Sequence, residues 1–223
     1  MVYTIAGFLV GLLIPYMARR FSKFMPSTPA YALYRLVKQN KISSKAKLNS
    51  KYVKLRSKYL MRSFGYAIIS VALTTAVITH IDNNLWWYLG FGWTLLLLTE
   101  IDIKMLLLPD IVTIPLLIGG FVFASVVGDS IDSVDSSLGA MVGYALPVLA
   151  TLLMLWKSVD AFGGGDIKLL AAIGAWLGPE GVIYTILVSC IVFGIYSAVK
   201  RQKAGAFGPS LAFAAVVVLL FLF

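Results

Sequence analysis

The chain has 223 residues, of which 60% are hydrophobic, and its 19 Lys or Arg against 10 Asp or Glu give a formal net charge of +9. This apolar content exceeds that of an ordinary soluble domain, and windows of about 17–25 apolar residues, the length that crosses a lipid bilayer, recur along the chain. We therefore expect an all-α, polytopic membrane protein. The single cysteine, Cys190, excludes a disulfide within the chain and a zinc site made of several cysteines.

The first apolar segment, Tyr3 to Ala18, has no basic residue before it and no small-residue cleavage site after it. We therefore expect a retained helix rather than a cleaved signal peptide. The region 19–62 follows and is strongly basic, with thirteen Lys or Arg and no Asp or Glu. The sequence predicts two regions: residues 1–63, with the first span and this basic cytoplasmic loop, and residues 64–223, with the remaining spans. About eight spans are expected in all, at 3–18, 64–80, 84–100, 110–127, 136–156, 167–178, 181–199 and 205–222.

The distribution of charge orients these predicted spans. If the basic loop is cytoplasmic, alternating crossings place the remaining Lys and Arg on the same side: Lys104, Lys157, Lys168, Lys200, Arg201 and Lys203. The opposite loops carry only acidic charges: Asp82, Asp129, Asp132, Asp135 and Glu180. This pattern agrees with the positive-inside rule, which supports eight spans and predicts that both termini lie outside.

The sixth span, 167–178, is short, because twelve helical residues cover only about 18 Å at about 1.5 Å per residue. A re-entrant segment is the alternative. That alternative would carry Lys200, Arg201 and Lys203 to the outside, against the charge rule. We therefore favour a short crossing helix, accommodated by local thinning of the bilayer or by burial among its neighbours.

Two carboxylates are expected at the cytoplasmic ends of apolar spans. Asp166 follows the three glycines 163–165 at the start of the sixth span, and Asp102 follows the third span. An ionised carboxylate near hydrocarbon is costly in free energy, which indicates that each of these aspartates has a structural or functional role. Two carboxylates within a few ångströms share a proton, so that one can activate water while the other protonates a peptide carbonyl, as in aspartic proteases.

Other interpretations of these residues stay open. Asp166 lies where a helix N-cap would lie, and the glycines are compatible with a simple flexible turn. The only histidine, His80, is predicted on the opposite side of the membrane. A Ser-His-Asp triad and a His-based metal site are therefore excluded.

The segment Gly163-Gly164-Gly165-Asp166, continued by Ile167-Lys168-Leu169-Leu170, resembles the Gly-x-Gly-Asp motif of the type IV prepilin peptidases, a family of membrane aspartic proteases. The other aspartate of that family opens a segment that ends in Pro-Asp, and the residues from Ile101-Asp102 to Pro109-Asp110 have this layout. The resemblance extends from about Leu95 to Phe223, and the order of the two motifs makes it specific.

The resemblance implies a transmembrane Gly-x-Gly-Asp peptidase core within residues 64–223. It implies cleavage of the leader from type IV prepilins or pseudopilins at the cytoplasmic face of the bacterial inner membrane. Asp102 and Asp166 would be the catalytic pair, and Gly163, Gly165, Lys168 and Pro109 would support the backbone of the two motifs. No cofactor is expected for peptide cleavage. The expected partners are the precursor and anionic lipids beside the basic loop, but no nucleic acid, and the oligomeric state is left open.

The first region departs from the family pattern. Many bacterial members carry paired Cys-x-x-Cys motifs there and also methylate the new N-terminus, whereas this region has no cysteine. The stretch after the first helix is also different, with Gly11-Leu12-Leu13-Ile14-Pro15-Tyr16 in its place. No metal site is expected, and S-adenosylmethionine is expected as a cofactor only if methyltransferase activity is retained.

Two other functions compete with this hypothesis. Signal-peptide-peptidase-like Gly-x-Gly-Asp proteases typically have Tyr-Asp at the first aspartate, whereas this chain has Ile101-Asp102. A small transporter or assembly protein would use the buried acids for ion coupling or helix packing. No inverted repeat supports the transporter.

Overall fold

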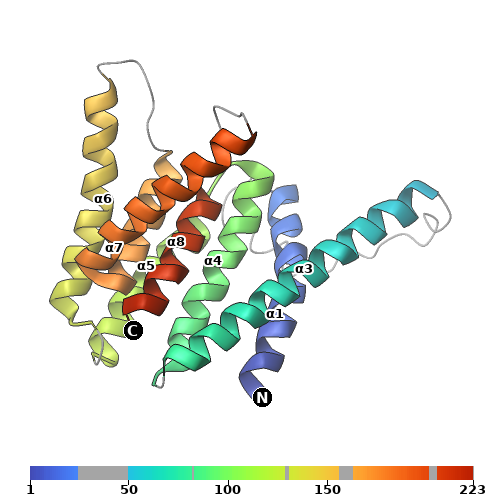
Figure 1. Cartoon of the computed structure of the whole chain (residues 1–223), viewed down its shortest axis with the longest axis horizontal. Coiled ribbons are helices and arrows are strands. Elements are labelled where there is room, and N and C mark those ends of the chain that lie inside the picture. Colours follow the sequence, from blue (N-terminus) through green and yellow to red (C-terminus); the bar gives the residue numbers. More distant parts are fainter. Residues whose placement is uncertain (25–49, 82, 129–130, 156–162, 201–204, 223) are drawn as a thin grey trace. The chain divides into compact units, whose positions relative to one another are not determined.

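The computed structural model describes residues 1–24, 50–81, 83–128, 131–155, 163–200 and 205–222, and within these ranges the regular secondary structure is entirely helical (Figure 1). This confirms the all-α class. The helices are α1 (Val2–Phe24), α3 (Ser50–His80), α4 (Leu85–Met105), α5 (Asp110–Val126), α6 (Ser133–Leu155), α7 (Gly164–Lys200) and α8 (Gly208–Leu222).

Four of these helices are long and apolar enough to cross a membrane, with candidate spans at Val2–Ser22, Lys58–His80, Ser133–Leu153 and Gly164–Lys200. Shorter apolar helices occur at Asp110–Val126 and Gly208–Leu222. These helices indicate a multi-pass membrane protein. The number of eight spans stays a prediction, and the central part of the basic loop, 25–49, lies outside the described residues.

Both helices that border the basic loop extend beyond the predicted membrane spans. Helix α1 continues to Phe24, past the predicted end at 18, and α3 begins at Ser50, well before the predicted start at 64. Lys and Arg have high helix propensity, so basic residues do not end a helix where the apolar run ends. Hydropathy therefore locates the membrane-crossing part of a helix but not its ends.

The chain divides into two compact units, Met1–Ala76 and Val77–Phe223. In the first unit, α1 and α3 approach closely where α1 has glycine: a Cβ on Gly11 would lie 2.6 Å from the carbonyl oxygen of Tyr66. Small residues allow such close packing between membrane helices. The guanidinium of Arg19 also lies over the ring of Tyr59, 5.3 Å from its centroid.

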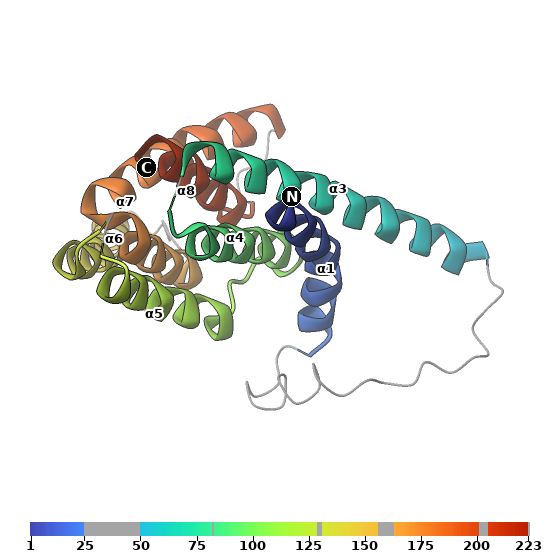
Figure 2. The same cartoon turned by 90° about the horizontal axis from the view of Figure 1, so that it is seen from below.

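The second unit is organised around α7, which contacts α5, α6 and α8, while α4 packs against α8 and α5 (Figures 1 and 2). Every residue from Leu169 to Gly178 is buried. Small residues let α6 and α7 pack backbone to backbone here, because a Cβ on Gly139 would lie 2.7 Å from the carbonyl carbon of Gly178. The first half of α7 is therefore the core of this unit.

Helix α7 is interrupted at Gly178, whose φ of 73° and ψ of −177° are not helical, and Pro179 follows. This break lies between the predicted sixth and seventh spans. A positive φ suits glycine, which has no Cβ to clash with its own backbone.

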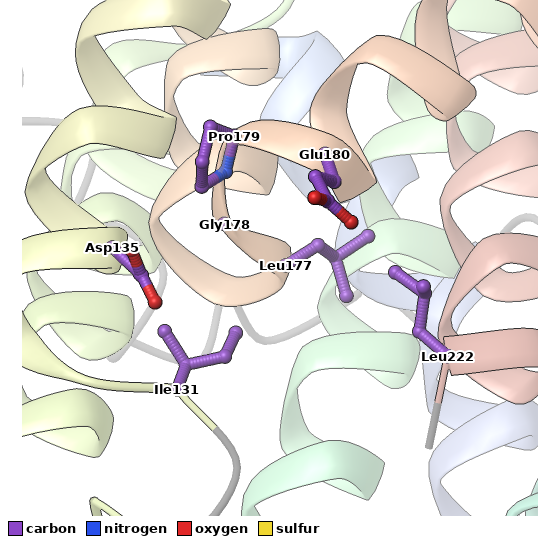
Figure 3. A pocket seen from close by; sticks show the side chains of 7 residues that line it. All are labelled: Ile131, Asp135, Leu177, Gly178, Pro179, Glu180 and Leu222. Atoms are coloured by element: carbon purple, nitrogen blue, oxygen red, sulfur yellow. The ribbon is translucent and has the colours of Figure 1, made fainter.

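A cavity of about 250 Å³ opens at the break and is shown in Figure 3; it is lined by Ile131, Asp135, Leu177, Gly178, Pro179, Glu180 and Leu222. The cavity contains none of the predicted site residues.

Candidate active site

Asp102 lies near the C-terminus of α4, and only 5% of its surface is exposed. Its Oδ2 accepts a hydrogen bond of 2.9 Å from the backbone N–H of Gly208, the first residue of α8. The N–H groups of the first helical turn have no partner inside their helix. Asp102 therefore satisfies one such donor from a helix that begins 106 residues later.

Asp166 lies in the first turn of α7 and is half-buried. The carbonyl oxygen of Gly163 accepts hydrogen bonds from the N–H groups of Asp166 and Ile167, at 3.0 and 3.2 Å. Gly163 thus begins the helix, and Asp166 is carried at a helix N-terminus, where a negative charge is favoured.

The structure brings these two aspartates together, since their carboxylates are close enough for their charges to interact. They come from different helices, α4 and α7, and both of these helices pack against α8. Two acids that repel one another in a partly buried site do not both ionise readily, so a proton binds to one of them more easily than to an isolated aspartate. Chemically, such a pair can take a proton from water and donate one to a substrate oxygen.

The segment after Asp102 turns sharply and leads into α5. Leu106 adopts the left-handed conformation, with φ of 51°, and its N–H donates to the carbonyl oxygen of Asp102 at 2.8 Å. Pro109 is buried and lies immediately before α5, where its carbonyl oxygen accepts the N–H groups of Val112 and Thr113 at 3.0 and 3.2 Å. Proline suits a helix start because its φ is already close to that of a helix and it has no N–H to satisfy.

The three glycines before Asp166 have different surroundings. A Cβ on Gly165 would lie 2.9 Å from the Cβ of Leu108 and 3.4 Å from the Leu108 backbone, so this glycine allows α7 to approach the 106–109 turn. A Cβ on Gly163 would lie 3.2 Å from Oδ2 of Asp166 itself. Nothing lies within 4 Å of a Cβ on Gly164. The close contacts thus occur at the two positions that the Gly-x-Gly pattern reserves for glycine.

Lys168 and Asp110 form an ion pair between the first turns of α7 and α5. The Lys168 Nζ donates to both carboxylate oxygens of Asp110 at 2.7 Å, and the two side chains are 46% and 53% exposed. An exposed pair of this kind adds little to overall stability. It does connect the segment after Asp102 to the helix that carries Asp166.

Sequence reasoning missed Gly208 and Leu108 as neighbours of the two aspartates. Gly208-Pro209 lies near the start of the last predicted span, 205–222, and no local pattern indicates which side chain would meet it. Leu108 has no signal of its own within the run of leucines 106–108. Asp102, Asp166, Gly163, Gly165, Lys168 and Pro109 all lie within this one region of the second unit.

Comparison with known proteins shows what this chain is similar to. Residues 89–198 match the type IV leader peptidase family. The chain is similar to proteins named prepilin leader peptidase/N-methyltransferase from three bacteria. For Aeromonas salmonicida (strain A449) the identity is 41% over 138 residues, 57% of this chain and 46% of the relative. For the relative from Neisseria gonorrhoeae the identity is 34% over 139 residues, which cover 56% of this chain and 48% of the relative. For the relative from Dichelobacter nodosus the identity is 35% over 161 residues, which cover 69% of this chain and 56% of the relative.

The chain spans about half the length of the curated relatives it matches. No solved structure matches it significantly. The segment that matches the family includes both aspartates, the turn at 106–109 and the Gly-x-Gly-Asp helix start. The resemblance seen in the two motifs is thus confirmed by the match of residues 89–198 to the type IV leader peptidase family.

Proposed function

We propose that this chain is an aspartic endopeptidase that removes the leader peptide from type IV prepilins or pseudopilins. The observation that carries the proposal is the approach of Asp102 and Asp166 from two different helices, inside a segment that matches a leader peptidase family. The relatives are named for the same activity.

In the proposed mechanism one carboxylate of the pair takes a proton from a water molecule, which attacks the carbonyl carbon of the scissile peptide. The other member of the pair, in its protonated form, donates its proton to the carbonyl oxygen, which gives a diol intermediate. As the C–N bond breaks, the first acid gives the water-derived proton to the leaving amine, and the second takes a proton back from a hydroxyl of the diol. Gly163, Gly165, Lys168 and Pro109 would keep the two segments at the required separation. The cleavage itself uses water and the two acids, with no cofactor.

We place this site at the cytoplasmic face of the bacterial inner membrane, with eight spans and both termini outside. The support is the charge pattern, in which all Lys and Arg fall on the side of the basic loop. A basic loop beside an anionic leaflet would contact lipid headgroups. Residues 1–63 would form the region with this loop, and residues 64–223 the peptidase core. N-terminal methylation, with S-adenosylmethionine as donor, is named in the relatives and stays open for this chain.

Co-expression with a candidate precursor tests the proposal, with the N-terminus of the product read by mass spectrometry for both cleavage and methylation. We expect Asp102→Asn and Asp166→Asn each to abolish cleavage. Asp135→Asn is the matched control, because Asp135 is an exposed acid at the cavity beside Gly178, and it should leave cleavage intact. Cleavage should persist in detergent without any ion gradient, whereas a transporter would need one. Processing retained by either of the first two variants would contradict the assigned pair.

A further inference from the structure

The start of α8 meets Asp102 in a way that the peptidase motifs do not explain. Gly208 is buried and donates its N–H to Oδ2 of Asp102 at 2.9 Å. A Cβ on Gly208 would lie 2.7 Å from that oxygen, 3.1 Å from Cγ and 3.2 Å from Cβ of the same aspartate. All three nearest atoms belong to Asp102, so any side chain at 208 would displace this carboxylate.

Backbone conformation does not require glycine at this position. The described glycines with positive φ are Gly128 and Gly178, so Gly208 has a backbone that alanine also adopts. Within a helix, alanine is more favourable than glycine by about 1 kcal/mol. The physical reason for glycine at 208 is therefore the space that Asp102 occupies.

The position of Gly208 is itself held by its neighbours. The carbonyl oxygen of Phe207 accepts the N–H groups of Ser210 and Leu211 at 3.0 and 3.1 Å, which begins the helix. The Phe207 ring packs edge-on against Phe193 of α7, with centroids 5.2 Å apart. The N–H that Asp102 accepts is thus presented by a helix start that is anchored to the part of α7 beyond the break at Gly178.

We propose that Gly208 is a positioning residue for peptide cleavage: its N–H and its missing side chain hold the Asp102 carboxylate in the orientation that faces its partner. Anchoring one oxygen restricts rotation of the carboxylate, so the other oxygen keeps a constant direction for proton transfer. This inference rests on the proposed function, because it assigns Gly208 a role through Asp102.

Gly208→Ala tests the inference by displacing the carboxylate without removing it. A misplacement of about 1 Å in a catalytic group costs on the order of 100-fold in rate, so we expect kcat to fall by at least about 10-fold. KM should change by less than about 2-fold, because Gly208 is argued to act on the acid and not on substrate binding. Gly205→Ala is the matched control, since its Cβ would have its nearest neighbours at 3.9 and 4.0 Å, and it should keep wild-type kcat.

A double-mutant cycle, measured by thermal melting in detergent, tests the contact between Gly208 and Asp102 independently of activity. Gly208→Ala should lower the melting temperature in the wild-type background and lower it less in an Asp102→Ala background, where the crowding oxygen and Cγ are gone. Wild-type kcat in Gly208→Ala, or equal shifts in melting temperature in both backgrounds, would overturn the inference. If Asp102→Asn itself cleaved the precursor, the proposed function would fail, while the melting cycle would still report whether the contact exists.

Discussion

Two neighbouring glycines in the Gly-x-Gly-Asp segment should respond very differently to the same substitution. A Cβ on Gly165 would lie 2.9 Å from the Cβ of Leu108, whereas nothing lies within 4 Å of a Cβ on Gly164. Carbon atoms in contact prefer a separation of about 3.5–4.0 Å. Gly165→Ala therefore has to push the start of α7 and the 106–109 turn apart by roughly 0.6–1.1 Å.

The effect on stability should be small. Overpacking costs about 1–3 kcal/mol, and the higher helix propensity of alanine offsets about 1 kcal/mol of this. The effect on activity should be larger, because Asp166 is the next residue and moves with the backbone. A shift approaching 1 Å between the two acids lowers the rate by on the order of 100-fold. We expect a loss of about 10- to 100-fold in kcat for Gly165→Ala and a change of less than about 3-fold for Gly164→Ala.

The assay is leader cleavage of a purified precursor in detergent, followed over time by gel mobility and mass, with a thermal melt of each variant as the control for folding. Both variants should melt within a few degrees of the wild type. The reasoning about close approach is refuted if Gly165→Ala cleaves at the wild-type rate, or if Gly164→Ala loses as much activity as Gly165→Ala while both remain folded.

Three further sets of substitutions test an ion pair, a buried hydrogen bond and a close helix contact in the second unit. Lys168→Met and Asp110→Asn should each slow cleavage by a few-fold with little change in melting temperature, and the double variant should be no slower than the slower single one, since both remove one ion pair. Trp176→Phe removes a buried 2.8 Å hydrogen bond to a carbonyl of α5 and should destabilise the fold by about 1–2 kcal/mol in thermal melts. Gly139→Ala places a Cβ against the α7 backbone, which cannot rotate away, so little protein should accumulate in membranes, whereas Gly194→Ala, in open space, should accumulate normally.

Patterns of neighbouring residues in the sequence were sufficient to predict helices and helix breaks, because these features depend mainly on residues that are close together in the chain. Long apolar runs predicted helices, and the break between the sixth and seventh spans was expected close to Gly178, where glycine and proline are adjacent in the sequence. Helices α1 and α3 extend beyond the predicted spans, because basic residues continue a helix as readily as apolar ones. The number of spans and the roles of the site residues stay predictions.

The sequence by itself determined the class of protein and both aspartate motifs, because membrane spans and motifs depend on residues that are adjacent in the chain. The tertiary structure alone decided what surrounds the two acids. Leu108 against Gly165, and Gly208 against Asp102, are contacts between separate helices. Gly208, the hydrogen-bond partner of Asp102, begins a helix 106 residues later. A contact between residues so far apart in the chain produces no periodicity or composition pattern that would predict it. The Gly-x-Gly-Asp segment thus provides one acid, and the packing of α4, α7 and α8 provides the orientation of the other.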